Sequence, residues 1–256
     1  MPSPLPPFGF DTSRREALGL FTAGASALAG RGAVSLHLRA VAFDAFVLFD
    51  PRGIVRRARP LMGEKADTII STASNKLFAY TWFYTSAARY MPFEMLAQSA
   101  LRFAAGAQGV SLSDAEYAYL VHGYSELDVW PDVAAGLQTM RDNKVRLTVL
   151  SNMSEGPLRS SLRRNGIEDK FESVLSTDLA RQYKPARAAY QLGVSALGLP
   201  ARSIGFAASA AWDAAGASWF GYPTVWVNRL HAPDEFAPVS ATTGDAFDSV
   251  IALAGS

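Results

Sequence analysis

Short apolar runs that alternate with longer helical segments leave few folds open to this chain. The helical segments have proline or glycine at their ends, which is typical of helix boundaries. The apolar runs have the length expected of strands that are buried on both faces of a sheet. They are Arg39–Phe43, Val145–Leu150, Ser173–Leu175, Ile204–Ala207 and Thr224–Val227. We therefore expect an α/β fold with a doubly wound, Rossmann-like parallel sheet and right-handed crossovers.

The helices of this pattern are expected at Pro131–Asn143, Glu155–Asn165, Pro185–Leu197 and from Asp213 to the residue before Gly221. One segment breaks the alternation, because residues 54–129 have aromatic and aliphatic side chains at helical spacing and no strand-like run. We interpret it as an inserted helical cap on a core made of residues 38–53 and 130–256. The tail, residues 231–256, is expected to be loop-like with a short helix at Ala246–Ala254.

The first 30 residues have the pattern of an export signal. Ser13-Arg14-Arg15-Glu16-Ala17-Leu18 precedes a mildly apolar run that closes in Ala27-Leu28-Ala29, as in a twin-arginine signal. The run is too short and too rich in Gly and Ala to span a bilayer, which takes about 20 strongly apolar residues. We expect residues 1–30 to direct the protein to the periplasm, where its mature form has no contact with the membrane. The alternative is a cytoplasmic chain with an ordinary N-terminal extension.

Composition excludes several classes of function. The 256 residues are 49% hydrophobic with a formal charge of +1, which fits a single globular domain with or without an insert. Because the charges are interspersed, there is no basic stripe for nucleic acid, and we expect no such partner. No cysteine is present, and the histidines are scattered at His37, His122 and His231. We therefore expect no thiol nucleophile, no Fe–S cluster, no Cys-containing zinc site and no His-rich metal site. We also expect no cofactor.

Polar side chains follow the predicted strands where each strand ends. Asp44 follows the first strand, Ser151 and Asn152 the second, Lys184 comes after the third, and Asp213 follows the fourth. The carboxyl ends of parallel strands meet at one edge of a sheet, so we expect these groups to converge. A carboxylate near an ammonium stays ionised and can attack an electrophilic carbon. This edge of the sheet is therefore a candidate site of nucleophilic catalysis.

An ordered set of motifs from about Arg39 to Phe236 resembles the type II L-2-haloacid dehalogenases of the haloacid dehalogenase superfamily. The motifs are Phe43-Asp44-Ala45-Phe46, Leu48-Phe49-Asp50, Tyr80-Thr81-Trp82, Arg89-Tyr90, Leu150-Ser151-Asn152, Tyr183-Lys184-Pro185 with Tyr190, and Ala211-Trp212-Asp213-Ala214. The resemblance implies that a small 2-halo acid is hydrolysed to a 2-hydroxy acid without a metal. Asp44 would displace the halide and form an ester, which water would then hydrolyse.

The resemblance also implies roles for the remaining residues. Ser151 would hold the substrate carboxylate, Asn152 would face the leaving halide, and Lys184 with Tyr190 would stabilise the nucleophile. Asp213 would orient Lys184 and the hydrolytic water. The apolar residues Phe46, Phe78, Phe93 and Trp212 would line the substrate pocket, or else belong to an ordinary core between the domains.

Aromatic residues at positions 80, 82, 83 and 84 exceed what one helix face can bury in a domain of this size. Their surplus indicates a homodimer surface, which the resemblance also implies. The alternative is that these rings seal the cap onto the core.

The chain departs from the family pattern at three places. Phe46-Val47-Leu48 replaces a Tyr-Gly-Thr-Leu stretch after the nucleophile. Ser74 stands where the family has a cap arginine, and Lys76, the nearest cation, is about 200° away around a helix. Ala208-Ser209-Ala210 replaces Ser-Ser-Asn, so two polar side chains associated with hydrolysis are missing.

These departures leave two alternatives to a working dehalogenase with an altered active site. One is a degenerate relative that binds a small carboxylate or a partner without turnover. The other is a magnesium-dependent phosphatase, which needs a second Asp two residues after the nucleophile and an acidic ligand near the fourth strand. Phe46 and Ala208 occupy those places.

Overall fold

The structure is a computed structural model that describes residues 38–235 and 241–255. The predicted export signal at residues 1–30 lies outside the described residues. Within the described ranges, no helix combines the length and the apolar character that crossing a bilayer requires.

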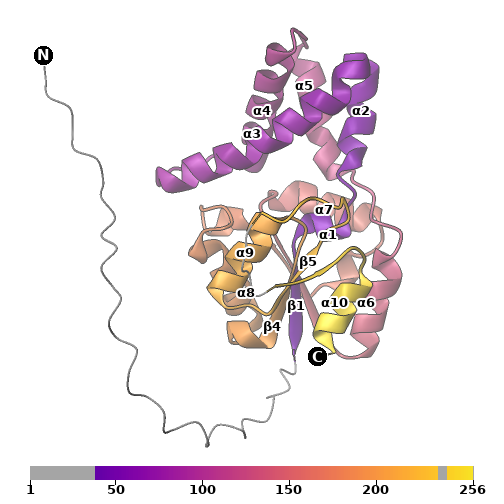
Figure 1. Ribbon diagram of the computed structural model, residues 1–256, viewed down its shortest axis with the longest axis vertical. Helices are drawn as coiled ribbons and strands as arrows, with labels where there is room; N and C mark the ends of the chain where they lie inside the picture. The colour runs from indigo at the N-terminus through magenta and orange to yellow at the C-terminus, as the bar shows by residue number, and fades with distance from the viewer. Residues whose placement is uncertain (1–37, 236–240, 256) are drawn as a thin grey trace, which may run out of the picture. The chain divides into compact units, whose positions relative to one another are not determined.

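In the described part of the chain, six parallel strands form one sheet in the order β3-β2-β1-β4-β5-β6 (Figure 1). The strands are β1 (Ala40–Phe43), β2 (Arg146–Ser151), β3 (Ser173–Ser176), β4 (Ile204–Ala208), β5 (Thr224–Val227) and β6 (Ala241–Gly244). This order is that of a doubly wound sheet whose direction of winding reverses between β1 and β4. The expected α/β fold with a parallel, Rossmann-like sheet is confirmed.

Helices cover both faces of this sheet (Figure 1). Along β1 the side chains alternate between the faces, so Val41 and Phe43 belong to one apolar cluster and Ala40 and Ala42 to the other. Phe43 stacks on Phe247 at 5.6 Å between ring centres. All four β1 residues are fully buried, which explains why this strand reads as a continuous apolar run.

The helices that flank the sheet are α6 (Val133–Asp142), α7 (Glu155–Arg164), α8 (Arg187–Leu197), α9 (Ala211–Phe220) and α10 (Asp248–Ala254). A short helix, α1 (Ala45–Leu48), directly follows β1. Single turns of 3-10 helix occur at Gly63–Lys65, Gly123–Ser125, Glu168–Lys170, Thr177–Leu179 and Ala201–Ser203.

The segment between β1 and β2 contains four further helices, which lie together at the top of Figure 1. They are α2 (Arg52–Met62), α3 (Ala66–Ser86), α4 (Phe93–Ala107) and α5 (Asp114–His122). The predicted division into a cap, residues 54–129, and a core, residues 38–53 and 130–256, stays a prediction. Among the described residues, the bridge between Phe49 and Val129 pairs the two ends of this segment where it leaves and rejoins the sheet.

The C-terminal tail differs from the sequence-based expectation. Ala241–Gly244 forms the edge strand β6 instead of a loop, and the last helix begins at Asp248. The strand reads Ala-Thr-Thr-Gly and stays largely accessible to solvent, so it has no apolar run by which it could have been predicted.

Candidate active site

Asp44 lies at the carboxyl end of the central strand β1, beside the point where the direction of winding reverses. Its backbone is extended, and its side chain caps α1 by accepting a hydrogen bond from the Phe46 amide at 3.1 Å. The Asp44 amide donates to the carbonyl of Ala207 in β4 at 2.9 Å. Strand pairing on one side and helix capping on the other thus fix the carboxylate in place.

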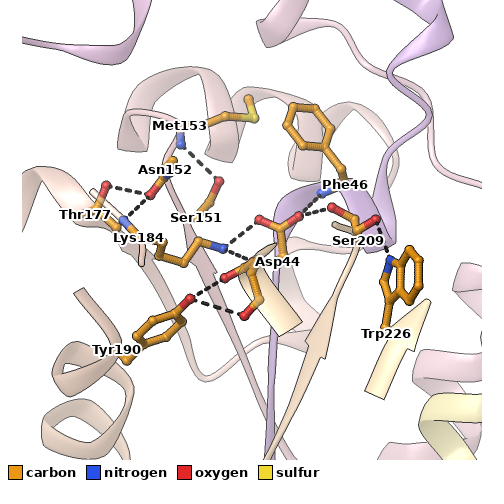
Figure 2. Close-up of polar contacts among 11 residues, drawn as sticks. Asp44, Phe46, Ser151, Asn152, Met153, Thr177, Lys184, Tyr190, Ser209 and Trp226 are labelled. Atoms are coloured by element: carbon orange, nitrogen blue, oxygen red, sulfur yellow. Dashed lines mark hydrogen bonds and ion pairs between the residues drawn. The ribbon is translucent and has the colours of Figure 1, made fainter. Parts of the chain in front are cut away.

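Lys184 lies between two carboxylates and is completely buried. Its ammonium donates to Asp44 Oδ1 at 2.8 Å (Figure 2). It also donates to Asp213 Oδ2 at 2.6 Å. Burial alone would lower the pKa of Lys184, but the negative charges of Asp213 and Asp44 raise it above its ordinary value. The lysine is therefore cationic at neutral pH.

Asp213 lies in the first turn of α9, directly after β4. Tyr190, from α8, donates its hydroxyl to Asp213 Oδ1 at 2.7 Å. Burial raises the pKa of Asp213 from 3.8 to about 6, although the ammonium of Lys184 acts in the opposite direction. Burial and the nearby Asp213 carboxylate also raise the pKa of Tyr190, so its hydroxyl keeps its proton.

Ser151 is the last residue of β2 and Asn152 follows it, at the same edge of the sheet (Figure 2). Ser151 Oγ accepts a hydrogen bond from the Met153 amide at 3.0 Å. Asn152 Oδ1 accepts one from the Lys184 amide at 2.9 Å and one from Thr177 at 3.3 Å. Asn152 Nδ2 is buried and has no partner among the described residues, so it is a donor available to an anion.

Ser209 is a site residue that the sequence reasoning missed. Its hydroxyl donates to Asp44 Oδ2 at 2.6 Å, and its carbonyl accepts a hydrogen bond from the Trp226 indole at 3.3 Å (Figure 2). Its position could have indicated a role, because Ser209 directly follows the last residue of β4 and carries the single hydroxyl of the Ala208-Ser209-Ala210 stretch. Together, Lys184 and Ser209 engage both oxygens of Asp44.

A cavity of about 240 Å³ adjoins this cluster. The residues that line it are Phe46, Pro51, Ile54, Ile70, Ser74, Leu77, Phe78, Tyr124, Trp130, Ser209, Ala210, Val227, Arg229 and Leu230. Of the predicted pocket residues, Phe46 and Phe78 are among them. Phe93 and Trp212 are not, but each packs against a lining ring: Phe93 on Tyr124 at 5.2 Å and Trp212 on Phe78 at 5.3 Å between ring centres.

The charged groups near the cavity are few. Ser74 lines it, whereas the Lys76 ammonium lies 4.4 Å from the ring centre of Phe103 on α4. Arg229 is the charged side chain among the lining residues, and both of its terminal nitrogens bond to Asp132 at 2.9 Å. Its Nε is buried without a partner in the described part of the chain. The sequence reasoning singled out no residue between the predicted strand that ends at Val227 and the tail that begins at His231, and so missed Arg229.

The described residues contain no group of three or more His, Asp or Glu side chains arranged to hold a metal ion. The two carboxylates of the cluster face the Lys184 ammonium instead. A nucleophilic carboxylate, a fixed cation and a second carboxylate are the groups needed to form and hydrolyse an ester.

The comparisons with known proteins point in the same direction. Residues 38–221 match the model of the haloacid dehalogenase-like hydrolases. The chain is 31% identical over 218 residues to haloacetate dehalogenase H-2 of Moraxella sp. (strain B), covering 84% of this chain and 97% of the relative. It is 32% identical over 194 residues to an (S)-2-haloacid dehalogenase of Pseudomonas sp. (strain YL), covering 75% and 84%. A crystal structure of an L-2-haloacid dehalogenase superposes with a TM-score of 0.82 at 33% identity, over 86% of this chain and 99% of that one.

Proposed function

Because the chain belongs to the haloacid dehalogenase-like hydrolases, we propose that it replaces the halogen of 2-halo acids by hydroxyl through an ester on Asp44, without a metal. The observation that carries this proposal is the buried Lys184 ammonium, which bonds to Asp44 and to Asp213. It places a positive charge beside the nucleophile and is positioned for the charge that develops during ester hydrolysis.

In the first step, one oxygen of Asp44 attacks C2 of the substrate, and the carbon–halogen bond breaks with its electron pair going to the halide. We assign the attack to Oδ2, because Ser209, which contacts it, also lines the cavity. The unpartnered Nδ2 of Asn152 is the donor available to the departing halide. Ser151, at the same edge of the sheet, is assigned to the substrate carboxylate.

In the second step, water attacks Cγ of the Asp44 ester. The carbonyl oxygen is then Oδ1, which lies 2.8 Å from Lys184 Nζ in the resting site, so the ammonium stabilises the tetrahedral oxyanion. Asp213 orients Lys184 and accepts the proton of the water. Collapse of the intermediate breaks the ester bond between Cγ and Oδ2, and Oδ2 leaves as the hydroxyl oxygen of the product. It releases the 2-hydroxy acid and one proton and restores the Asp44 carboxylate.

The decisive measurement is halide release from both enantiomers of 2-chloropropanoate and 2-bromopropanoate, with and without a chelator. We expect release from the S enantiomer, insensitive to the chelator and abolished in Asp44→Asn. A single turnover in ¹⁸O-labelled water should place the label in Asp44, as mass spectrometry of the peptide that contains it would show. Release that depends on a divalent metal, or that persists in Asp44→Asn, would contradict the mechanism.

A second candidate function is supported by the methyl groups of Ala208 and Ala210, which offer no hydrogen bond to a hydrolytic water. A chain that forms the ester but cannot hydrolyse it would bind halo acids without turnover. The same mass spectra separate the two cases. A stoichiometric adduct on Asp44 without continued halide release would identify a protein in which only the first half-reaction survives.

A further inference from the structure

The cavity beside Asp44 is larger than a short halo acid needs. It measures about 240 Å³, whereas an apolar protein cavity of about 150 Å³ already accepts benzene. Aromatic and aliphatic side chains make up most of its wall, among them Phe46, Ile70, Leu77, Phe78 and Trp130. A methyl group, such as the C2 substituent of 2-halopropanoates, would leave most of this apolar surface without a partner.

The charged side chain in the cavity wall, Arg229, offers little to a second anionic group, because only its Nε is without a partner among the described residues. The Asp132 carboxylate already neutralises this guanidinium through two hydrogen bonds of 2.9 Å. The ring of Trp130 lies 5.0 Å from the same guanidinium. The polar donors for a substrate carboxylate and a halide lie at the strand ends, at Ser151 and Asn152. The cavity is therefore left for the apolar part of a substrate.

Ser74 accounts for part of this volume. It lies on α3 and lines the cavity together with Leu77 and Phe78, which follow it by about one helical turn. Its side chain ends after one hydroxyl, whereas a longer side chain at this half-buried position would project into the space. The nearby Lys76 does not fill it, because its ammonium lies over Phe103 on α4.

From these observations we propose that the substrates are 2-halo acids with an apolar C2 substituent of about butyl to benzyl size, which occupies the cavity next to Ser209 and Ser74. This inference rests on the proposed dehalogenase function and specifies its substrate class. Each methylene moved from water into such a cavity contributes about fourfold to the specificity constant.

The first test compares kcat/KM for (S)-2-bromopropanoate, (S)-2-bromohexanoate and (S)-2-bromo-3-phenylpropanoate. We expect a value at least tenfold higher for the two larger acids. Equal values, or a preference for bromopropanoate, would overturn the inference while leaving the dehalogenase assignment intact. Binding of unreactive hexanoate and propanoate, measured by calorimetry, tests the cavity without catalysis, and hexanoate should bind at least tenfold more tightly.

The second test fills the cavity with Ser74→Leu. We expect this variant to lose at least tenfold in kcat/KM for bromohexanoate and less than threefold for bromopropanoate. Ser71→Leu, an exposed position on the same helix, is the matched control and should change neither value. Thermal melting confirms that both variants are folded. Equal losses on both substrates in Ser74→Leu would overturn the inference.

Absence of halide release from all three acids would instead refute the dehalogenase function, and hexanoate binding would still decide whether the cavity is an apolar site.

Discussion

Lys184 carries its ammonium between two buried carboxylates, and a charge that loses its partner inside a protein destabilises the fold far more than one in water. The three groups come from segments that are distant in the sequence: Asp44 from β1, Lys184 from the loop after β3, and Asp213 from α9. Their contacts therefore join different parts of the fold as well as forming the candidate active site.

We expect Lys184→Met to lower the free energy of unfolding by about 3–5 kcal/mol at pH 7, because it leaves Asp44 and Asp213 facing each other without a cation. Activity should be lost as well. Urea unfolding at pH 7 and pH 5 checks this, and the loss of stability should be smaller at pH 5, where Asp213 becomes protonated. Lys170→Met, at a partly exposed lysine that bonds to Gln138, should change the stability by less than about 0.5 kcal/mol.

The pKa of Asp213, about 6, predicts the pH dependence of the reaction. The carboxylate orients Lys184 and accepts a proton only when it is ionised. Because this pKa belongs to the free site, kcat/KM should fall as the pH drops below about 6. Steady-state halide release between pH 4.5 and 8 measures this. A kcat/KM that stays constant across this range would show that the ionisation of Asp213 does not affect the reaction.

The same shift has a consequence for stability with a defined sign. The pKa of Asp213 is raised on folding, from 3.8 to about 6, so between these values the folded chain binds more protons than the unfolded one. The contribution of Asp213 to stability is therefore largest below about pH 4 and decreases as the pH rises through 6. Asp50 and Asp132 act in the opposite sense, because hydrogen bonds from Arg52 and Arg229 outweigh burial and lower their pKa values.

At the residue level, the positions of Asp44, Ser151, Lys184 and Asp213 were predictable because the carboxyl ends of buried parallel strands converge. Ser209 also follows a strand end, but it was missed because the Ala208-Ser209-Ala210 stretch was interpreted only through its two alanines. Phe46 and Phe78 line the cavity, whereas Phe93 and Trp212 pack against rings of its wall. This difference depends on how the helices that carry these residues pack together. No local pattern in the sequence encodes that arrangement.

Among the elements, α6 and α10 pack so closely that a single methyl group matters. A Cβ at Gly136 on α6 would clash with the ring of Phe247, which precedes α10. We expect Gly136→Ala to destabilise the fold by about 1–3 kcal/mol in urea unfolding. Gly156→Ala is the matched control, because it lies on the exposed side of α7 with nothing within 4 Å, and it should be neutral or stabilising by up to about 1 kcal/mol.

The ends of the strands with apolar runs, β1 to β5, were predicted to within one residue, because burial on both faces dictates the composition of these strands. The edge strand β6 was not, because only its pairing with β5 defines it. An edge strand that is largely accessible needs no apolar residues, and its Thr and Gly residues read as a loop.

For the molecule as a whole, we propose a homodimer that uses the exposed aromatic face of α3. Trp82 is 38% exposed and Phe83 is 66% exposed, although both are large apolar side chains. We expect sedimentation to show a dimer at micromolar concentration and Phe83→Lys to shift it to monomer. Trp219→Lys, an equally exposed aromatic on α9, should leave the dimer intact. A wild-type monomer at all concentrations would contradict the proposal.

The cluster of Asp44, Lys184 and Asp213 contains two anions and one cation, so the resting site has one net negative charge where there is little water. The 2-halo acid adds a second negative charge with its carboxylate, and the halide carries one away when the ester forms on Asp44. The ester state therefore has the same net charge as the resting site, but that charge lies on the bound acid, and Lys184 and Asp213 remain as a neutral pair. Hydrolysis restores the negative charge of Asp44, and the product leaves with its own. Catalysis thus moves one negative charge from Asp44 to the bound acid and back in each turnover.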